Sequence, residues 1–237
     1  MPNTATRAPL MAALLSTQVA AASPSLPDGF VYLDTLAPKV RQEMHYAGSD
    51  NFVGRPLAGY LAARCILTQQ AATRLARIET ELSAKGLGLR IFDCYRPQRA
   101  VNDLLQWSKD PSDQINKTRY YPHVPKDQLF ARGYIIEKSG HTRGSTVDLT
   151  VEVRTPGAAV PGKIKSNGEL DMGTAFDWFG EASHTDNPDQ PVDVRANRRW
   201  FTDLMARHGF RNLPEEWWHY TLVDEPFPDT YFDFPVR

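Results

Sequence analysis

Residues 146–153, Thr-Val-Asp-Leu-Thr-Val-Glu-Val, alternate polar and apolar side chains without interruption. In an extended chain, a period of two places the apolar side chains on one face. Val147, Leu149 and Val151 therefore share one side of the segment, and Asp148 lies among the polar residues of the other. The pattern predicts a half-buried β-strand, which requires a core on one side of it.

Helical periodicity appears on both sides of this strand in the sequence. Between Leu67 and Leu82, apolar residues recur every three or four positions, Thr68 is a suitable N-cap, and Gly86 follows at the expected C-cap. The same reasoning predicts four more elements: helices over 98–107 and 193–208, and strands over 87–94 and 217–223. Long loops are predicted over 108–130 and 154–190. Because these elements lack a regular βαβ rhythm, we expect an α+β fold: a single domain with a small antiparallel sheet flanked by helices.

Charge and hydropathy exclude several classes of protein. The 237 residues include 27 basic and 28 acidic side chains, which give a net charge of −1. This balance argues against a nucleic-acid partner. No run of about 18 apolar residues occurs, so no membrane-spanning helix is expected.

The N-terminal region differs in composition from the rest. Arg7 is the only charged residue before Asp28, Pro9–Ala22 is mostly small and apolar, and Ala20–Ala22 has the small-residue spacing of a cleavage site. We therefore expect a signal peptide over 1–22 and a periplasmic or otherwise exported domain over 23–237. The alternative is a cytoplasmic protein in which this segment is a tail or follows an upstream start codon.

Cys65 and Cys94 are the only cysteines. In an exported protein such a pair favours a disulfide, whereas in a cytoplasmic protein it favours two buried thiols. Closing a loop of about 30 residues would stabilise the fold by roughly 3–4 kcal/mol. The disulfide prediction therefore depends on export.

Of the six histidines, His141 has a metal-ligand pattern nearby. It lies in a turn between Gly140 and Gly144, and Asp148 follows on the polar face of the predicted strand. A turn that enters a strand can fold back, so both side chains can point at one position. Imidazole and carboxylate suit zinc, although two ligands also arise by chance or as a simple hydrogen bond.

His219 offers a third ligand. It alternates with Trp217 along the last predicted strand and can face inward. Two histidines, one aspartate and a water molecule give the open coordination of a catalytic zinc ion, one per chain. Glu216 precedes the strand and could act as the general base without binding the metal. The alternative is a solvated carboxylate beside Glu215.

Arg96 follows a predicted strand and precedes the chain-breaking Pro97. A guanidinium held there could stabilise the oxyanion that forms when hydroxide adds to a carbonyl. An ion pair with Asp93 explains the residue equally well.

Five motifs now occur in order: Tyr95-Arg96-Pro97, Ser139-x-His141-x-x-Gly144-Ser145-x-x-Asp148, Glu216-Trp217-Trp218-His219-Tyr220, Asp224-Glu225-Pro226 and Tyr231-Phe232-Asp233-Phe234-Pro235-Val236. In these motifs, from about residue 31 to residue 237, the chain resembles the D-alanyl-D-alanine dipeptidases of the vancomycin-resistance type, zinc enzymes of the D,D-peptidase/Hedgehog fold group. The resemblance implies the zinc-dependent hydrolysis of D-alanyl-D-alanine, a small dipeptide, in cell-wall dipeptide turnover or salvage.

The resemblance also implies roles for single residues. It makes His141, Asp148 and His219 the zinc ligands, Glu216 the base and Arg96 the arginine that stabilises the transition state. The free amino group of the substrate would be held by Ser139 and by Asp177, in Met172-Gly173-Thr174-Ala175-Phe176-Asp177. Tyr46 matches a tyrosine that lines the pocket.

Two other functions remain open. A zinc D,D-carboxypeptidase that trims peptidoglycan stem peptides would use the same metal site in an open cleft, and Asp177 favours the dipeptidase over it. A noncatalytic zinc-stabilised binding module would need neither Glu216 nor Arg96. At position 94 the resistance-type enzymes tend to have glycine, which leaves the compartment and role open. The sequence gives no oligomeric state.

Overall fold

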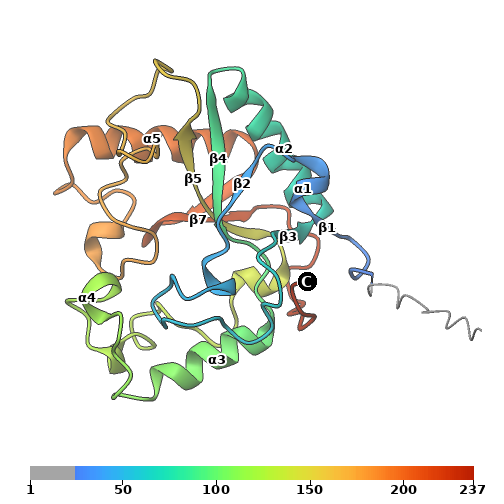
Figure 1. Cartoon of the computed structure of the whole chain (residues 1–237), viewed down its shortest axis with the longest axis vertical. Coiled ribbons are helices and arrows are strands. Elements are labelled where there is room, and N and C mark those ends of the chain that lie inside the picture. Colours follow the sequence, from blue (N-terminus) through green and yellow to red (C-terminus); the bar gives the residue numbers. More distant parts are fainter. Residues whose placement is uncertain (1–24) are drawn as a thin grey trace, which may run out of the picture.

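A computed structural model describes residues 25–237 of the chain (Figure 1). The predicted signal peptide over 1–22 lies outside the described residues. In the part that is described, no helix combines the length and the apolar character needed to cross a membrane. Helices and strands are mixed as expected, so the predicted α+β class is confirmed.

The main sheet has five strands in the order β2-β4-β5-β7-β6. Their bounds are β2 Arg41–Gln42, β4 Leu87–Asp93, β5 Thr146–Val153, β7 Glu216–Leu222 and β6 Phe210–Leu213. Every pairing is antiparallel except that of β2 with β4, which is parallel. The expected antiparallel sheet is therefore confirmed apart from this short edge strand. Two further strands, β1 Phe30–Tyr32 and β3 Ile66–Thr68, form a separate antiparallel pair.

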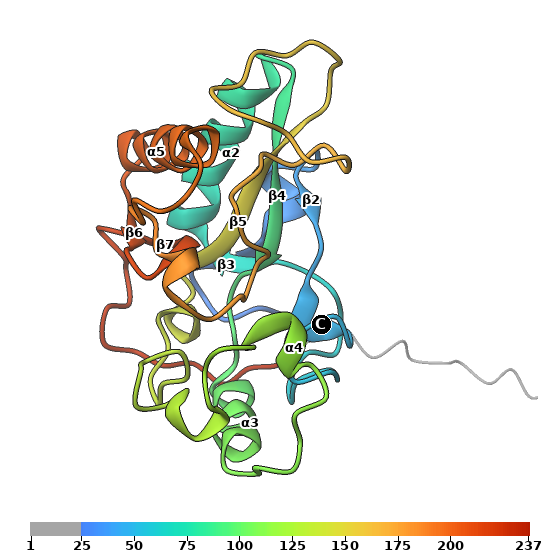
Figure 2. The same ribbon diagram turned by 90° about the vertical axis from the view of Figure 1, so that its left-hand side faces the viewer.

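Helices α2 (Gln69–Ser83) and α5 (Val192–Arg207) cover one face of the sheet (Figure 2). The predicted N-cap of α2 is confirmed, because the Thr68 hydroxyl accepts a hydrogen bond from the Ala71 amide at 3.3 Å. The apolar stripe of α2 is fully buried, as its periodicity predicts. The short helix α1 (Leu33–Leu36) packs against α2.

Strand β5 has its predicted bounds, but the prediction that it is half-buried is wrong. Val147, Leu149 and Val151 are inaccessible to solvent. So is Thr150 on the polar face, while Asp148 is only 2% exposed. The polar face is covered because Asp148 faces two histidines and Glu152 pairs with Arg41 and Arg154. Alternation alone does not distinguish a solvated face from a buried polar one.

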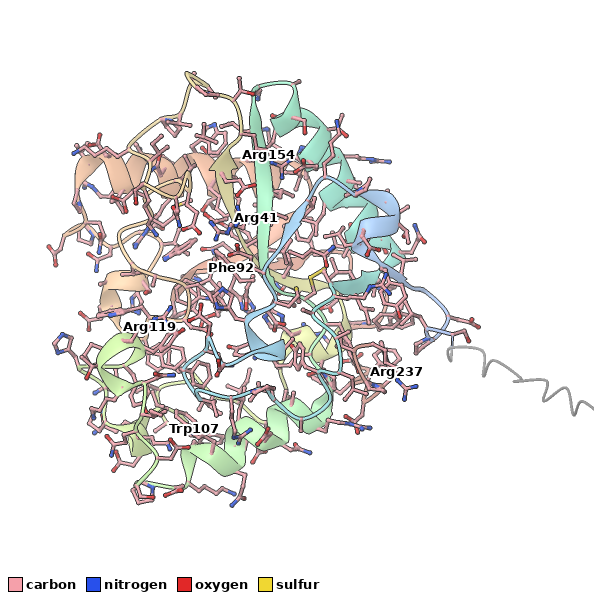
Figure 3. The ribbon with its side chains drawn as sticks, viewed as in Figure 1. Arg41, Phe92, Trp107, Arg119, Arg154 and Arg237 are labelled. Atoms are coloured by element: carbon pink, nitrogen blue, oxygen red, sulfur yellow. A yellow bond between two sulfur atoms is a disulfide. The ribbon has the colours of Figure 1, made fainter. Side chains whose placement is uncertain are left out.

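The lower half of the molecule is mostly irregular (Figure 1). It contains α3 (Gln98–Ser108), the single turn α4 (Lys117–Tyr120) and short 3-10 turns. The predicted loop over 108–130 thus contains α4 and the 3-10 turn 126–128, whereas 154–190 contains one 3-10 turn and isolated β-bridges at residues 164, 169 and 170. In Figure 3, Trp107 lies in this half, and Arg41 and Arg154 lie with the sheet above it. Aromatic side chains make a second buried cluster here, including Tyr46, Phe52, Tyr95, Trp107, Tyr120 and Phe179.

Two long-range links lie near the segment that follows β4. Cys65, beside β3, and Cys94, directly after β4, form a disulfide. The C-terminal segment packs back onto the chain, since the Val236 amide donates to the Gly59 carbonyl at 2.9 Å. These links fix the segment that carries Arg96.

Candidate active site

Three predicted metal ligands converge at the end of the sheet. Asp148 on β5 pairs directly with His219 on β7, and its Oδ1 lies 3.2 Å from His219 Nδ1. On the other side, Asp148 Oδ2 lies 3.3 Å from His141 Nε2. One ligand atom from each of the three residues lies within 4.8 Å of the others. The structure therefore brings together the whole predicted ligand set.

A tight turn presents His141 to the sheet. The side chain of Ser139 caps the 3-10 turn Gly140–Arg143 by accepting a hydrogen bond from the His141 amide at 3.3 Å. Gly144 ends the turn with φ at +81°, and a Cβ there would lie 2.2 Å from the ring of Phe30. Glycine is required at this position because both the backbone conformation and the space exclude a side chain.

The orientation of His141 suits a metal ligand. Its Nδ1 lies 2.7 Å from the carbonyl oxygen of Cys94, and because a carbonyl can only accept, Nδ1 carries the proton. The lone pair is then on Nε2, which faces Asp148. Nε2 of His141 and Oδ1 of Asp148 are buried and have no hydrogen-bond partner among residues 25–237. Unpaired buried atoms of these types fit a zinc ion, and the carbonyl is the usual kind of outer partner for a ligating histidine.

The electrostatics of the three residues favour a cation. Burial alone would raise the pKa of Asp148, but His141 and His219 outweigh it and hold that pKa well below its usual value. Burial also lowers the pKa of His219, but the nearby carboxylates of Asp148 and Glu216 outweigh this and raise it to about 10. A metal ion that binds here competes with the proton on His219.

Glu216 lies beside the ligand set without belonging to it. It is the first residue of β7, and its Oε2 is 3.3 Å from His219 Nδ1. The sequence placed Glu216 just before the strand, and the structure places it within the first position of the strand. Its side chain is 15% exposed and lines the same cavity as the ligands.

Arg96 makes the ion pair with Asp93 and also reaches the cavity. Its Nε and Nη2 donate to Asp93 Oδ2 at 3.0 and 2.8 Å, and Nη2 lies 3.7 Å from Asp148 Oδ2. The side chain lines the cavity together with the three ligands. The two interpretations of Arg96 from the sequence are therefore compatible.

The cavity in front of this cluster holds about 60 Å³, which is room for a few water-sized groups. It is lined by Tyr46, Ser139 and Asp177 as well as by Arg96, Glu216 and the three ligands. Its remaining wall is apolar and includes Phe52, Val101, Leu104, Ile135, Phe179 and Leu213. The sequence did not identify this wall, because apolar residues with helical spacing on α3 look the same whether they face a core or a pocket.

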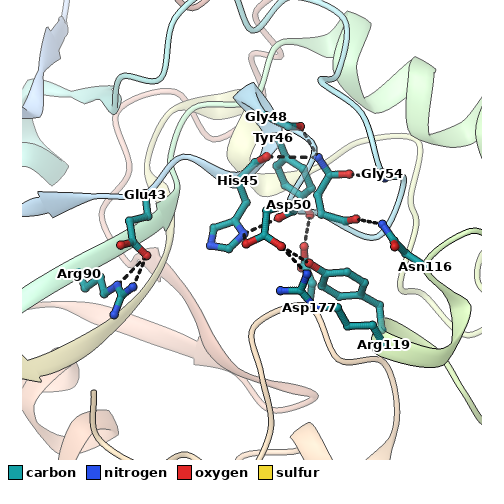
Figure 4. Close-up of polar contacts among 12 residues, drawn as sticks. Glu43, His45, Tyr46, Gly48, Asp50, Gly54, Arg90, Asn116, Arg119 and Asp177 are labelled. Carbon is teal, nitrogen blue, oxygen red and sulfur yellow. Dashed lines mark hydrogen bonds and ion pairs between the residues drawn. The ribbon is translucent and has the colours of Figure 1, made fainter. Parts of the chain in front are cut away.

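Tyr46 and Asp177 form a buried pair on the cavity wall. The Tyr46 hydroxyl donates to Asp177 Oδ2 at 2.7 Å, and Figure 4 shows the two side chains reaching each other from distant segments. Burial, reinforced by the nearby charge of Asp148, holds the pKa of Asp177 well above its usual value. Asp177 is also the only described residue other than glycine with a positive φ, at 59°. Such a buried, constrained carboxyl group is typical of a functional site.

The chain is similar in sequence to several known proteins. The profile of the family described as D-ala-D-ala dipeptidase matches residues 27–237. A D-alanyl-D-alanine dipeptidase of Streptomyces coelicolor is 42% identical over 87% of this chain and 98% of that protein. One of Enterococcus faecium is 38% identical over 88% of this chain and 98% of that protein. A crystal structure of the vancomycin resistance D,D-pentapeptidase VanY with Zn(II) matches 69% of this chain and 76% of that one, with a TM-score of 0.37 and 14% identity.

Proposed function

The chain belongs to the D-ala-D-ala dipeptidase family, and on that premise we propose that it hydrolyses D-alanyl-D-alanine to two molecules of D-alanine at a zinc site. The observation that carries the proposal is the convergence of His141, Asp148 and His219 around two unpaired buried atoms. These three side chains would hold one zinc ion. A bound zinc ion supplies Lewis acidity at the peptide carbonyl and makes water more acidic.

Glu216 would move the protons. Its carboxylate lies beside the ligand set, on the cavity wall, where it could reach the water molecule that attacks the peptide carbonyl. It would accept a proton from that water and deliver it to the amine of the leaving D-alanine. Because Glu216 is not among the three ligands, it is free to change its protonation state.

Arg96 would stabilise the negative charge that develops on the carbonyl oxygen. Its guanidinium is held by Asp93 and lines the cavity next to Asp148. A positive charge fixed in place before the reaction stabilises the transition state without a cost of reorganisation.

Asp177 would bind the free ammonium group of the dipeptide, with Tyr46 and Ser139 beside it. A buried ammonium loses its hydration, and a carboxylate partner offsets that loss. The bound ammonium would in turn stabilise the charged form of Asp177, against the upward shift of its pKa by burial. An N-acylated peptide lacks the charge and adds bulk, so this subsite favours a dipeptidase over a D,D-carboxypeptidase.

We further propose that the enzyme acts outside the cytoplasm, in cell-wall dipeptide turnover or salvage. The composition of residues 1–22 and the disulfide between Cys65 and Cys94 support this compartment. N-terminal sequencing of the protein from its host tests the proposal. A start near residue 23 is expected, and a protein that retains Met1 would contradict export.

The function is tested by comparing two substrates on the zinc-loaded enzyme: free D-alanyl-D-alanine and its N-acetyl derivative. We expect kcat/KM to be at least about 100-fold higher for the free dipeptide, since the acylated one leaves Asp177 unpaired. In Asp177→Asn this ratio should fall towards one. Equal rates on both substrates would favour the carboxypeptidase, and no hydrolysis of either would favour the noncatalytic binding module.

A further inference from the structure

We propose that Asp93 is a positioning residue that keeps Arg96 in the cavity and away from the metal ligand Asp148. The inference rests on the proposed function, because it gives Arg96 a role in the same reaction. Asp93, Asp148 and His219 lie in one row across β4, β5 and β7. Two aspartates are thus neighbours on adjacent strands, and a single arginine lies within reach of both.

Asp93 holds Arg96 by two hydrogen bonds. Both donors of Arg96, Nε and Nη2, bond to the same oxygen, Oδ2 of Asp93. Asp93 is inaccessible to solvent, so this charge-assisted contact is not weakened by water. The guanidinium is planar, and two donors fixed on one edge determine its orientation.

Tyr60 fixes Asp93 from the other side. Its hydroxyl donates to Asp93 Oδ1 at 2.6 Å, so both carboxylate oxygens have a partner. Tyr60 itself is held by the C-terminal segment, through a bridge with Val236 and the bond from the Val236 amide to Gly59. The C-terminal end of the chain therefore contributes to the position of Arg96.

The competing partner of Arg96 is Asp148. Arg96 Nη2 lies 2.8 Å from Asp93 but 3.7 Å from Asp148 Oδ2, the oxygen that faces His141. The guanidinium carbon lies over the ring of Tyr46, 4.6 Å from the ring centre. Without the charge of Asp93, Arg96 gains most by pairing with Asp148. That pairing occupies a ligand oxygen and opposes the binding of a cation.

A double-mutant cycle on zinc affinity separates an effect of Asp93 that acts through Arg96 from an effect that does not depend on Arg96. The variants are Asp93→Asn, Arg96→Ala and the double variant, and zinc binding is measured by competition with a chromophoric chelator. We expect Asp93→Asn to weaken zinc binding by about tenfold and to lower kcat by about 10–100-fold with little change in KM. In the double variant, zinc affinity should return to within about twofold of Arg96→Ala, because no arginine is left to compete.

Glu169→Gln is the matched control. Glu169 is another buried carboxylate beside the sheet, and its Oε1 lies 2.6 Å from Arg90 Nη1. This variant also removes a charge from a buried arginine pair, but it should leave zinc affinity and kcat unchanged. Tyr60→Phe keeps the inference testable if Asp93→Asn fails to fold, since it should weaken zinc binding in the same direction by about threefold.

Two results would overturn the inference. Zinc binding that stays weak in the double variant would show that Asp93 acts through His141, whose Nδ1 lies 3.5 Å away, and not through Arg96. Unchanged zinc affinity in Asp93→Asn and Tyr60→Phe would show that Asp93 contributes only to folding. If the wild-type chain fails to hydrolyse D-alanyl-D-alanine, the proposed function fails, but the zinc cycle still reports on Arg96.

Discussion

The polar face of β5 carries two buried charged regions with opposite character. At one end, Asp148 faces His141 and His219, and atoms of Asp148 and His141 have no hydrogen-bond partner among the described residues. Towards the other end, Arg90 on β4 lies between Glu43 and Glu169. Figure 4 shows the Arg90–Glu43 contact well apart from Tyr46 and Asp177.

The difference separates a structural ion-pair cluster from a functional site. In the Arg90 cluster each charge meets an opposite charge: Arg90 Nη1 makes no hydrogen bond of good geometry within the part of the chain that the structure describes, but it lies 2.6 Å from Glu169 Oε1. At the Asp148 end the acceptors outnumber the donors, and the unpaired atoms converge on one position. Burial, charge and an unpaired polar atom are common to both regions, and the site is marked by the convergence of three metal-ligand side chains, two of which carry an unpaired atom.

His141→Ala should have the largest effect. It removes one of three metal ligands, so we expect stoichiometric zinc to be lost and hydrolysis to disappear with it. Metal analysis after dialysis, together with an assay for released D-alanine, measures both. A variant that keeps its zinc and its activity would show that His141 is not a metal ligand. The Asp148 region would then not be distinguished from the Arg90 cluster as a metal site.

Glu216→Gln should lower kcat by about 10³–10⁴-fold while zinc is retained. The change keeps the shape of the side chain but removes the ability to accept a proton. Zinc content and kcat measured on the same preparation separate the base from the ligands. Activity within tenfold of the wild type would mean that another group moves the proton.

Loss of the disulfide should destabilise the fold by roughly 3–4 kcal/mol, since it closes a loop between residues that are 29 positions apart. Chemical denaturation of Cys65→Ser with Cys94→Ser, compared with the oxidised wild type, measures the loss. The Cys94 carbonyl also bonds His141 Nδ1, so zinc affinity in this variant should fall as well. Unaltered stability would indicate that the contacts around Val236 suffice to hold the segment.

Glu169→Gln should have the smallest effect, about 2 kcal/mol of stability, because Arg90 keeps Glu43 as a second partner. Its kcat should equal that of the wild type. The two measurements are the midpoint of urea unfolding and steady-state kinetics at saturating substrate. A large fall in kcat would show that the Arg90 cluster is coupled to the site, contrary to the comparison drawn above.

The elements that the sequence predicted well are long and regular. Strand β5 has its predicted bounds, and α2 and β7 agree within two residues, because each carries several periods of its pattern. Strands β2, β3 and β6 were missed because they have two to four residues, which is too short for a period to be visible. They form through pairing with distant partners, such as Arg41 with Arg90.

The residues of the candidate site also fall into two groups: those that the sequence identified and those whose role only the structure showed. The sequence identified His141, Asp148, His219 and Glu216 because the chemistry of each is local: a glycine-flanked turn, an alternating strand and a carboxylate three positions from an imidazole. The sequence offered two equal explanations of Arg96. Only the structure showed that Arg96 both pairs with Asp93 and lines the cavity. The apolar wall had no signal in the sequence.

The sequence by itself determined which donor atoms the protein has and in which local conformations they are offered. Tertiary structure alone decided which of those atoms remain unpaired. Asp93, Asp148 and His219 come from three separate strands, and their distances depend on the register of β4, β5 and β7. Whether a buried carboxylate is neutralised by an arginine or left for a metal ion depends on differences of about 1 Å between such segments, and no local pattern encodes them.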